Sequence, residues 1–209
     1  MTKTSNKTFR VESVTRNIIK EINSDANSAN ARATMANIRN SVNRPLTEST
    51  DLLALLFRYM PEDFLSTDGK ISDEERAVIT TIQLYAIHQQ SKTESVLLEE
   101  NSEKWKNLGY SLRSLRKDGD SVAVDRRFNS MVTSTTFQEL SHHLRQMIKL
   151  LKSKTDAKVD YPRLSRDLYR YLRDLYRYLR GYGEEVKFSW ASRYYFVNSE
   201  KEGEKKNEK

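Results

Sequence analysis

The heptad Arg166-Asp-Leu-Tyr-Arg-Tyr-Leu172 is repeated without change as Arg173-Asp-Leu-Tyr-Arg-Tyr-Leu179. Because seven residues make nearly two turns of an α-helix, both copies present almost the same face. The apolar stripe on this face consists of Leu168, Leu172, Leu175 and Leu179, and a stripe of arginines lies on the opposite side. The repeat therefore predicts one long amphipathic helix over residues 161–180.

Helical periodicity continues along the rest of the chain. The apolar face of the first helix is expected to begin at Phe9. A capping box at 72–75 is expected to begin another helix. Asp160 can cap a helix whose first turn contains Pro162. Helices are expected over about 9–23, 31–42, 52–60, 72–86, 103–117, 122–132, 136–153, 161–180 and 184–196. No segment alternates with period two. The prediction is an all-α, two-lobed helical bundle of eight to nine helices without a sheet.

Charge is distributed unevenly. Residues 49–103 carry a net charge of −7, whereas residues 104–197 carry +10. The stretch 89–104 is polar and is the expected boundary between two helical lobes. We expect an N-terminal helical lobe over 1–92, a C-terminal basic lobe over 93–197 and a disordered charged tail over 198–209. Such polarity favours an anionic partner, most commonly nucleic acid.

The chain contains no cysteine, which excludes disulfides, thiol nucleophiles and cysteine metal sites. No run of about 18 apolar residues suits a bilayer, and the N-terminus has no apolar signal region. A cytoplasmic protein without membrane contact is expected.

Segment 109–128 concentrates positive charge in two short helical stretches around Asp118-Gly119. The cations are Arg113, Arg116 and Lys117 before the turn and Arg126 and Arg127 after it. Two such clusters can contact successive phosphates of one nucleic-acid strand. The same pattern fits a solvated helical corner, and the segment alone leaves both interpretations open.

Tyrosines interleave with arginines in the repeated heptads. Aromatic and guanidinium planes in this arrangement can stack on unpaired bases. Alternatively, the tyrosine rings pack the lobe and the arginine stripe is simply solvated.

In order and spacing, five segments resemble the small subunit of the type I-E CRISPR Cascade effector, the CasB family. They are an Arg-Ala helix at 30–40, the Gly-to-Arg-Arg-Phe block at 109–128, a leucine-rich helix at 140–151, the Asp-Tyr-Pro start at 160–169 and the Trp-Ala ending at 189–195.

This resemblance implies a non-catalytic subunit without cofactors. Its implied partners are the hybrid of CRISPR RNA and target DNA, the displaced DNA strand, CasC-type backbone and CasA-type large subunits, and a second copy of itself. Such a subunit stabilises the R-loop by contacts to the nucleic-acid backbone, because sequence is read by base pairing.

Basic residues in the matching blocks are the candidate nucleic-acid contacts. These are Arg39, Arg44, Arg113, Arg116, Lys117, Arg126, Arg127 and Arg145, with Arg166, Arg170 and Arg193 as weaker candidates.

Other functions find less support in the sequence. The histidines are His88, His142 and His143, no metalloprotease motif or glycine-rich phosphate loop occurs, and neither catalysis nor a metal is expected. A free-standing helical DNA- or RNA-binding protein remains the alternative, although the 161–180 helix lacks the Asn and Gln that read base edges. A scaffold whose basic face meets an acidic protein is a further possibility.

Overall fold

The computed structural model describes residues 2–24, 28–98, 103, 105–116, 121–177 and 182–196. Within these ranges the chain forms nine α-helices and no β-strand, which confirms the predicted all-α class. The helices are α1 (Thr2–Ser24), α2 (Ala29–Asn40), α3 (Thr50–Tyr59), α4 (Asp73–Gln89), α5 (Leu108–Arg113), α6 (Val122–Val132), α7 (Phe137–Lys154), α8 (Tyr161–Arg177) and α9 (Tyr182–Tyr195). Short 3-10 helices span Ser41–Asn43, Leu46–Glu48 and Glu62–Phe64.

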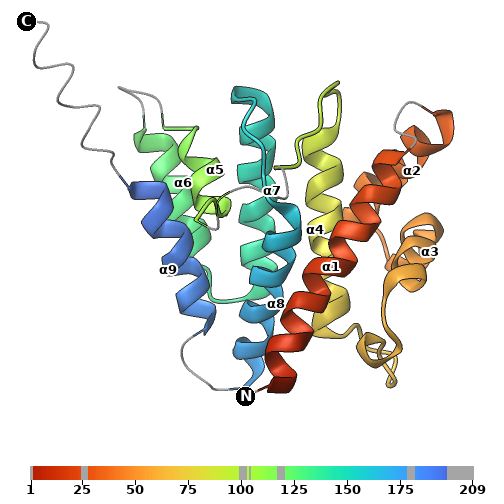
Figure 1. Cartoon of the computed structure of the whole chain (residues 1–209). Coiled ribbons are helices and arrows are strands. Elements are labelled where there is room, and N and C mark those ends of the chain that lie inside the picture. The colour runs from red at the N-terminus through yellow and green to blue at the C-terminus, as the bar shows by residue number, and fades with distance from the viewer. Residues whose placement is uncertain are drawn as a thin grey trace, which may run out of the picture.

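Most of the helices lie side by side and run between the two ends of the molecule (Figure 1). Helix α8 is central, because it packs against α1, α4 and α9. Helix α5 packs on α9 and α6 on α7, while α2 and α3 flank α1 and α4 on the other side. As a result, the C-terminal ends of α4, α7 and α9 all lie at the upper end in Figure 1.

Local hydrogen bonds begin several helices where the sequence predicts them. The hydroxyl of Ser72 accepts from the backbone N–H of Glu75, whose carboxylate accepts from the N–H of Ser72, so the predicted capping box is confirmed. At the start of α8, the carboxylate of Asp160 accepts from the N–H of Arg163 at 2.9 Å, and Pro162 lies in the first turn.

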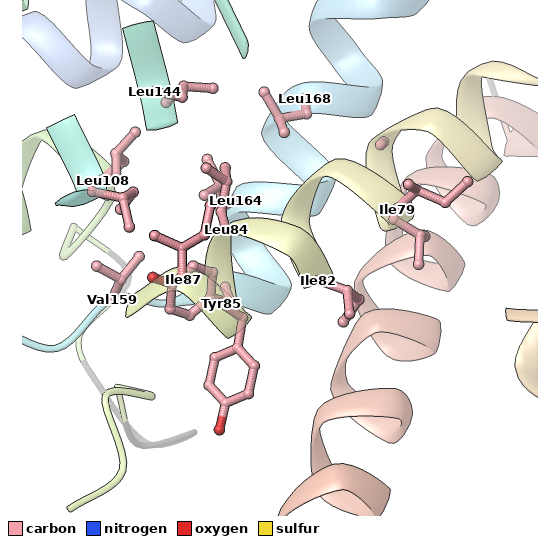
Figure 2. Packing of buried hydrophobic residues seen from close by; sticks show 14 of the residues in the cluster. Ile79, Ile82, Leu84, Tyr85, Ile87, Leu108, Leu144, Val159, Leu164 and Leu168 are labelled. Carbon is pink, nitrogen blue, oxygen red and sulfur yellow. The ribbon is translucent and has the colours of Figure 1, made fainter. Parts of the chain in front are cut away.

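A hydrophobic core joins helices from both halves of the chain. Leu84 of α4, Leu144 of α7, and Leu164 and Leu168 of α8 are fully or almost fully buried in one cluster (Figure 2). The division into lobes at residue 92 stays a prediction, and the tail 198–209 lies outside the described residues.

The predicted apolar face of the first helix is wrong at its beginning. Phe9 is 58% exposed, whereas Val11 is fully buried. The buried positions Val11, Val14 and Ile18 recur at steps of three and four residues, and a helix that buries them turns Phe9 toward solvent.

The first copy of the heptad packs into the core. Leu168, Leu172, Tyr169 and Tyr171 are all buried, so tyrosine packing is confirmed for the described part of this helix. The arginine stripe is not simply solvated, because Arg166 is largely buried in an ion pair with Glu12. Asp167 is buried as well and accepts a hydrogen bond from the indole N–H of Trp190 at 3.0 Å. Of the second copy, residues 178–179 lie outside the described ranges.

The expected helix over 103–117 is much shorter, because Asn107 ends the preceding loop and caps α5. The side-chain oxygen of Asn107 accepts from the N–H of Tyr110 at 3.2 Å. Its amide nitrogen donates to the carbonyl of Ser189 in α9 at 2.9 Å. A tertiary contact, which periodicity does not reveal, therefore sets the start of this helix.

Candidate nucleic-acid interface

Arg116 is anchored within the fold rather than free to bind phosphate. Its guanidinium forms two hydrogen bonds to the carboxylate of Asp125, at 2.9 and 3.3 Å, across the corner between α5 and α6. The hydroxyl of Tyr194 donates to the same carboxylate at 2.7 Å. Burial opposes ionisation of Asp125, but the hydrogen bonds from Tyr194 and Arg116 outweigh it and lower the pKa of this carboxyl.

Aromatic rings hold Arg116 on its other sides. The guanidinium carbon lies 5.4 Å from the ring centre of Tyr194 and 5.1 Å from that of Tyr195. The ring of Tyr194 in turn stacks on Phe128, with ring centres 3.7 Å apart. Replacing Arg116 would therefore disturb the packing of α9 on α6.

The other predicted cations of this corner have different environments. Arg126 and Arg127 are exposed on α6, where they can meet phosphates directly. Arg113 is half-buried on α5, with its guanidinium 5.8 Å from the ring centre of Phe196. Lys117 lies outside the described residues. The cluster expected from the sequence thus divides into one anchored and three accessible arginines.

Arg39 of α2 lines a hollow of about 770 Å³ that also includes Lys92, and we call this the α2–α4 hollow. Burial lowers the pKa of Arg39. Burial also lowers the pKa of Lys152, and the positive charges of Arg39 and Lys92 act in the same direction. Three cations from three elements are therefore close enough to repel one another. The ion pair of Lys92 with Asp156 at 2.6 Å offsets part of this repulsion, and an anionic ligand would offset more of it.

The remaining first-choice candidates lie in the loop after α2 and on α7. Arg44 is exposed in the loop that follows the 3-10 helix Ser41–Asn43. Arg145 is half-buried on α7, and burial lowers its pKa.

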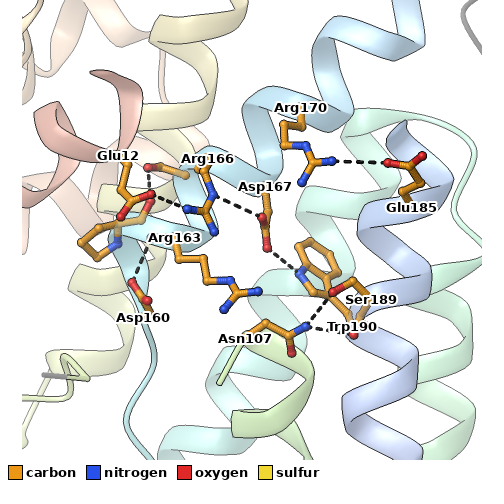
Figure 3. Close-up of polar contacts among 12 residues, drawn as sticks. Glu12, Asn107, Asp160, Arg163, Arg166, Asp167, Arg170, Glu185, Ser189 and Trp190 are labelled. Atoms are coloured by element: carbon orange, nitrogen blue, oxygen red, sulfur yellow. Dashed lines mark hydrogen bonds and ion pairs between the residues drawn. The ribbon is translucent and has the colours of Figure 1, made fainter. Parts of the chain in front are cut away.

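Two of the weaker candidates form ion pairs between helices, one largely buried and one at the surface (Figure 3). Arg166 donates to Glu12 of α1 at 2.7 Å, and both side chains are largely buried. Arg170 donates to Glu185 of α9 at 3.3 Å. These arginines connect neighbouring helices, so the pairs support the fold more directly than they support ligand binding.

Arg193 lines a second hollow, of about 910 Å³, between α5, α9 and the segment after α7. We call it the α5–α9 hollow, and it is also lined by Trp105, Tyr110, Arg113, Lys158 and Phe196. The two hollows are neighbours, because Lys92 in the first donates to Asp156 in the second at 2.6 Å. We call the cations that line the two hollows, together with Lys152, the basic end. They are Arg32, Arg39, Lys92, Arg113, Lys152, Lys158 and Arg193.

Sequence reasoning missed several residues of the two hollows and of the basic end. Lys92 and Trp105 lie in loops, and Lys152 and Lys158 lie at or beyond the end of α7. No motif marks them. The only available signal was their position near helix termini, which the fold brings to one end of the bundle.

The described residues were also compared with the requirements of metal sites and of membrane-spanning helices. In the described ranges no three His, Cys, Asp or Glu side chains come together so that they could hold a metal ion. None of the helices in those ranges has the length and apolar character needed to cross a bilayer.

Comparison with known proteins identifies the class. The fold is similar to the crystal structure of CasB from Thermobifida fusca, with a TM-score of 0.68 and 20% sequence identity over 90% of this chain and 98% of that one. Comparison with curated proteins gave no match. The chain thus has the fold of a CasB protein.

The family follows from the sequence itself. Residues 34–195, most of the chain, match the family described as CRISPR-associated protein Cse2, and the chain belongs to this family. The resemblance to a CasB-family subunit of Cascade is confirmed.

Proposed function

We propose that this chain is a non-catalytic small subunit of a type I-E Cascade that binds nucleic-acid backbone without sequence specificity. In this role it contacts the hybrid of CRISPR RNA and target DNA and the displaced strand, and thereby stabilises the R-loop. Its protein partners would be CasC-type and CasA-type subunits and a second copy of itself.

The observation that carries this proposal is the basic end. Arg39, Lys92 and Lys152 lie close together beside one hollow, and Arg113 and Arg193 line the adjacent one. Arg126 and Arg127 on α6 are exposed as well and are further cations that a phosphate could reach. Cations on separate elements, without a recognition helix, suit phosphate contacts rather than the reading of base edges.

Modest contacts are sufficient for such a role. Exchanging DNA–DNA pairing for RNA–DNA pairing is nearly balanced in free energy, so a few backbone contacts tip the equilibrium toward the open R-loop. Binding of this type weakens steeply with salt, because each phosphate contact releases counterions.

Co-expression with a type I-E CRISPR RNA and the other Cascade subunits tests the proposal. We expect two copies of this chain in the purified complex, measured by native mass spectrometry, and partial loss of the chain when salt is raised. The complex should open target DNA less readily when the chain is omitted.

Assembly of the remaining subunits without retention of this chain would contradict the proposal. If the isolated chain then still bound single-stranded DNA, a free-standing nucleic-acid-binding protein would be the better description of its function. Retention that survives nuclease treatment, combined with unchanged R-loop formation when the chain is omitted, would instead indicate a scaffold that contacts only protein.

A further inference from the structure

Two aromatic side chains in the α5–α9 hollow are unusually exposed. Trp105 is 40% exposed and Phe196 is 48% exposed. The ring of Tyr110 meets that of Trp105 edge-on, with ring centres 5.0 Å apart. Exposed apolar rings that lie together at a surface are a feature of ligand-binding grooves.

Cations surround these rings. The Arg193 guanidinium lies 5.6 Å from the ring centre of Trp105 and 6.0 Å from that of Phe196. Lys106 lies over the Trp105 ring at 5.6 Å. Among the described residues no ion pair joins Arg113, Arg193 or Lys106 to a carboxylate, so their charge is available to a ligand.

The one acidic residue in the lining is already neutralised. Asp156 pairs with Lys92 at 2.6 Å, and the hollow as a whole is therefore positive. An anionic ligand with a flat, unsaturated ring fits this combination of charge and aromatic surface.

The hollow is held in shape by its supporting contacts. Asn107 joins the start of α5 to Ser189 of α9, and the hydroxyl of Ser111 donates to the carbonyl of Lys158 at 2.7 Å. Gly109 lets the backbones of α5 and α9 approach closely. Because these elements are fixed before binding, little conformational entropy is lost when a ligand enters.

We propose that the α5–α9 hollow binds one unpaired nucleotide, whose base stacks on Trp105 while its phosphate lies near Arg113 and Lys158. The volume of about 910 Å³ is within the range of small-ligand sites. A base within a duplex has no free face to stack, so the site selects single strands. The inference rests on the proposed function for its nucleic acid and adds a base contact to the backbone contacts.

Titration with two matched strands separates the base contact from the phosphate contacts. One probe is a dodecamer of thymidines, and the other carries the same phosphates on abasic sugars. We expect the full chain to bind the thymidine strand more tightly, with quenching of Trp105 fluorescence that the abasic strand does not cause. Trp190, the only other tryptophan, is fully buried and serves as an internal reference.

The variant Trp105→Ala should lower affinity for the thymidine strand about tenfold and leave affinity for the abasic strand within twofold. Trp105→Phe should restore most of the lost affinity. Phe188→Ala is the control, because Phe188 is a 75% exposed aromatic residue of α9 that does not line the hollow.

Equal binding of both strands by the wild-type chain, with no effect of Trp105→Ala, would overturn the base site and leave the proposed backbone contacts standing. An equal loss for both strands in Trp105→Ala would also overturn it, because that pattern indicates a structural role for the ring. Failure of the wild-type chain to bind either strand at low salt would remove the base site and the proposed backbone contacts together.

Discussion

Gly109 lies directly against the backbone carbonyl of Trp190. A Cβ atom on residue 109 would lie 1.9 Å from the Trp190 oxygen, far inside van der Waals contact. Trp190 is fully buried and tied to Asp167 of α8, so its backbone cannot yield. This contact fixes α5 against α9 and, with them, the two sides of the α5–α9 hollow.

Gly109→Ala should therefore destabilise the protein. We expect a loss of about 3 kcal/mol in the free energy of unfolding, because α5 must move away from α9 and expose buried leucines. Denaturant unfolding measures the effect.

Gly183→Ala is the matched control. A Cβ there would lie 3.3 Å from the Tyr171 ring, so a shift of a few tenths of an ångström would relieve the contact, and alanine has a higher helix propensity than glycine. A change of less than about 1 kcal/mol is expected. Equal losses of unfolding free energy in the two variants would show that the close Gly109–Trp190 contact does not cause the destabilisation.

Reversal of Arg126 and Arg127 to glutamate should weaken strand binding without loss of stability. Both side chains are exposed, so the free energy of unfolding should change by less than about 0.5 kcal/mol for each. Loss of two phosphate contacts should lower the slope of log affinity against log salt by about two. Filter binding at several salt concentrations measures that slope, and an unchanged slope would remove both arginines from the interface.

Arg116→Glu should behave in the opposite way. It replaces an ion pair with two facing carboxylates beside Tyr194, and we expect a loss of about 3 kcal/mol in the free energy of unfolding. Thermal unfolding detects it. A fully stable variant with impaired binding would instead place Arg116 on the nucleic acid.

Acid should destabilise the protein through His88, which is fully buried in α4 with Nδ1 2.8 Å from the Tyr161 hydroxyl. Burial, aided by the charges of Lys92 and Lys152, lowers the pKa of His88 from 6.5 to about 4. The folded state thus favours the neutral ring. The resulting stability is present above pH 6.5 and is lost as pH falls toward 4, a change on the order of 3 kcal/mol.

His88→Gln should remove this part of the pH dependence, measured by urea unfolding between pH 4 and pH 7. His142→Gln, at an exposed position on α7, is the control and should retain the wild-type profile. Identical profiles for wild type and His88→Gln would assign the acid sensitivity to other groups.

Arg166→Met should destabilise the bundle and leave strand binding intact. The change removes a partner of Glu12, which is largely buried between α1 and α8, and we expect a loss of about 2 kcal/mol. Lys70→Met, which breaks an exposed pair with Asp68, should cost less than about 0.5 kcal/mol. A loss of strand affinity in a stable Arg166→Met variant would return Arg166 to the interface.

Local sequence determined the helices. Caps such as Ser72 with Glu75, and the apolar repeat through Leu168 and Leu172, act over a few residues, so periodicity and capping were sufficient to predict the all-α class and most helix boundaries. The CasB resemblance likewise rested on the order of these segments.

Only the tertiary structure decided the role of each charge. Arg116 pairs with a carboxylate nine residues away, and Arg166 with one 154 residues away. The α5–α9 hollow likewise joins Trp105 to Arg193 across four intervening helices. Whether an arginine is anchored or available depends on which helix faces pack together, and that packing results from burial of the whole core rather than from any local pattern.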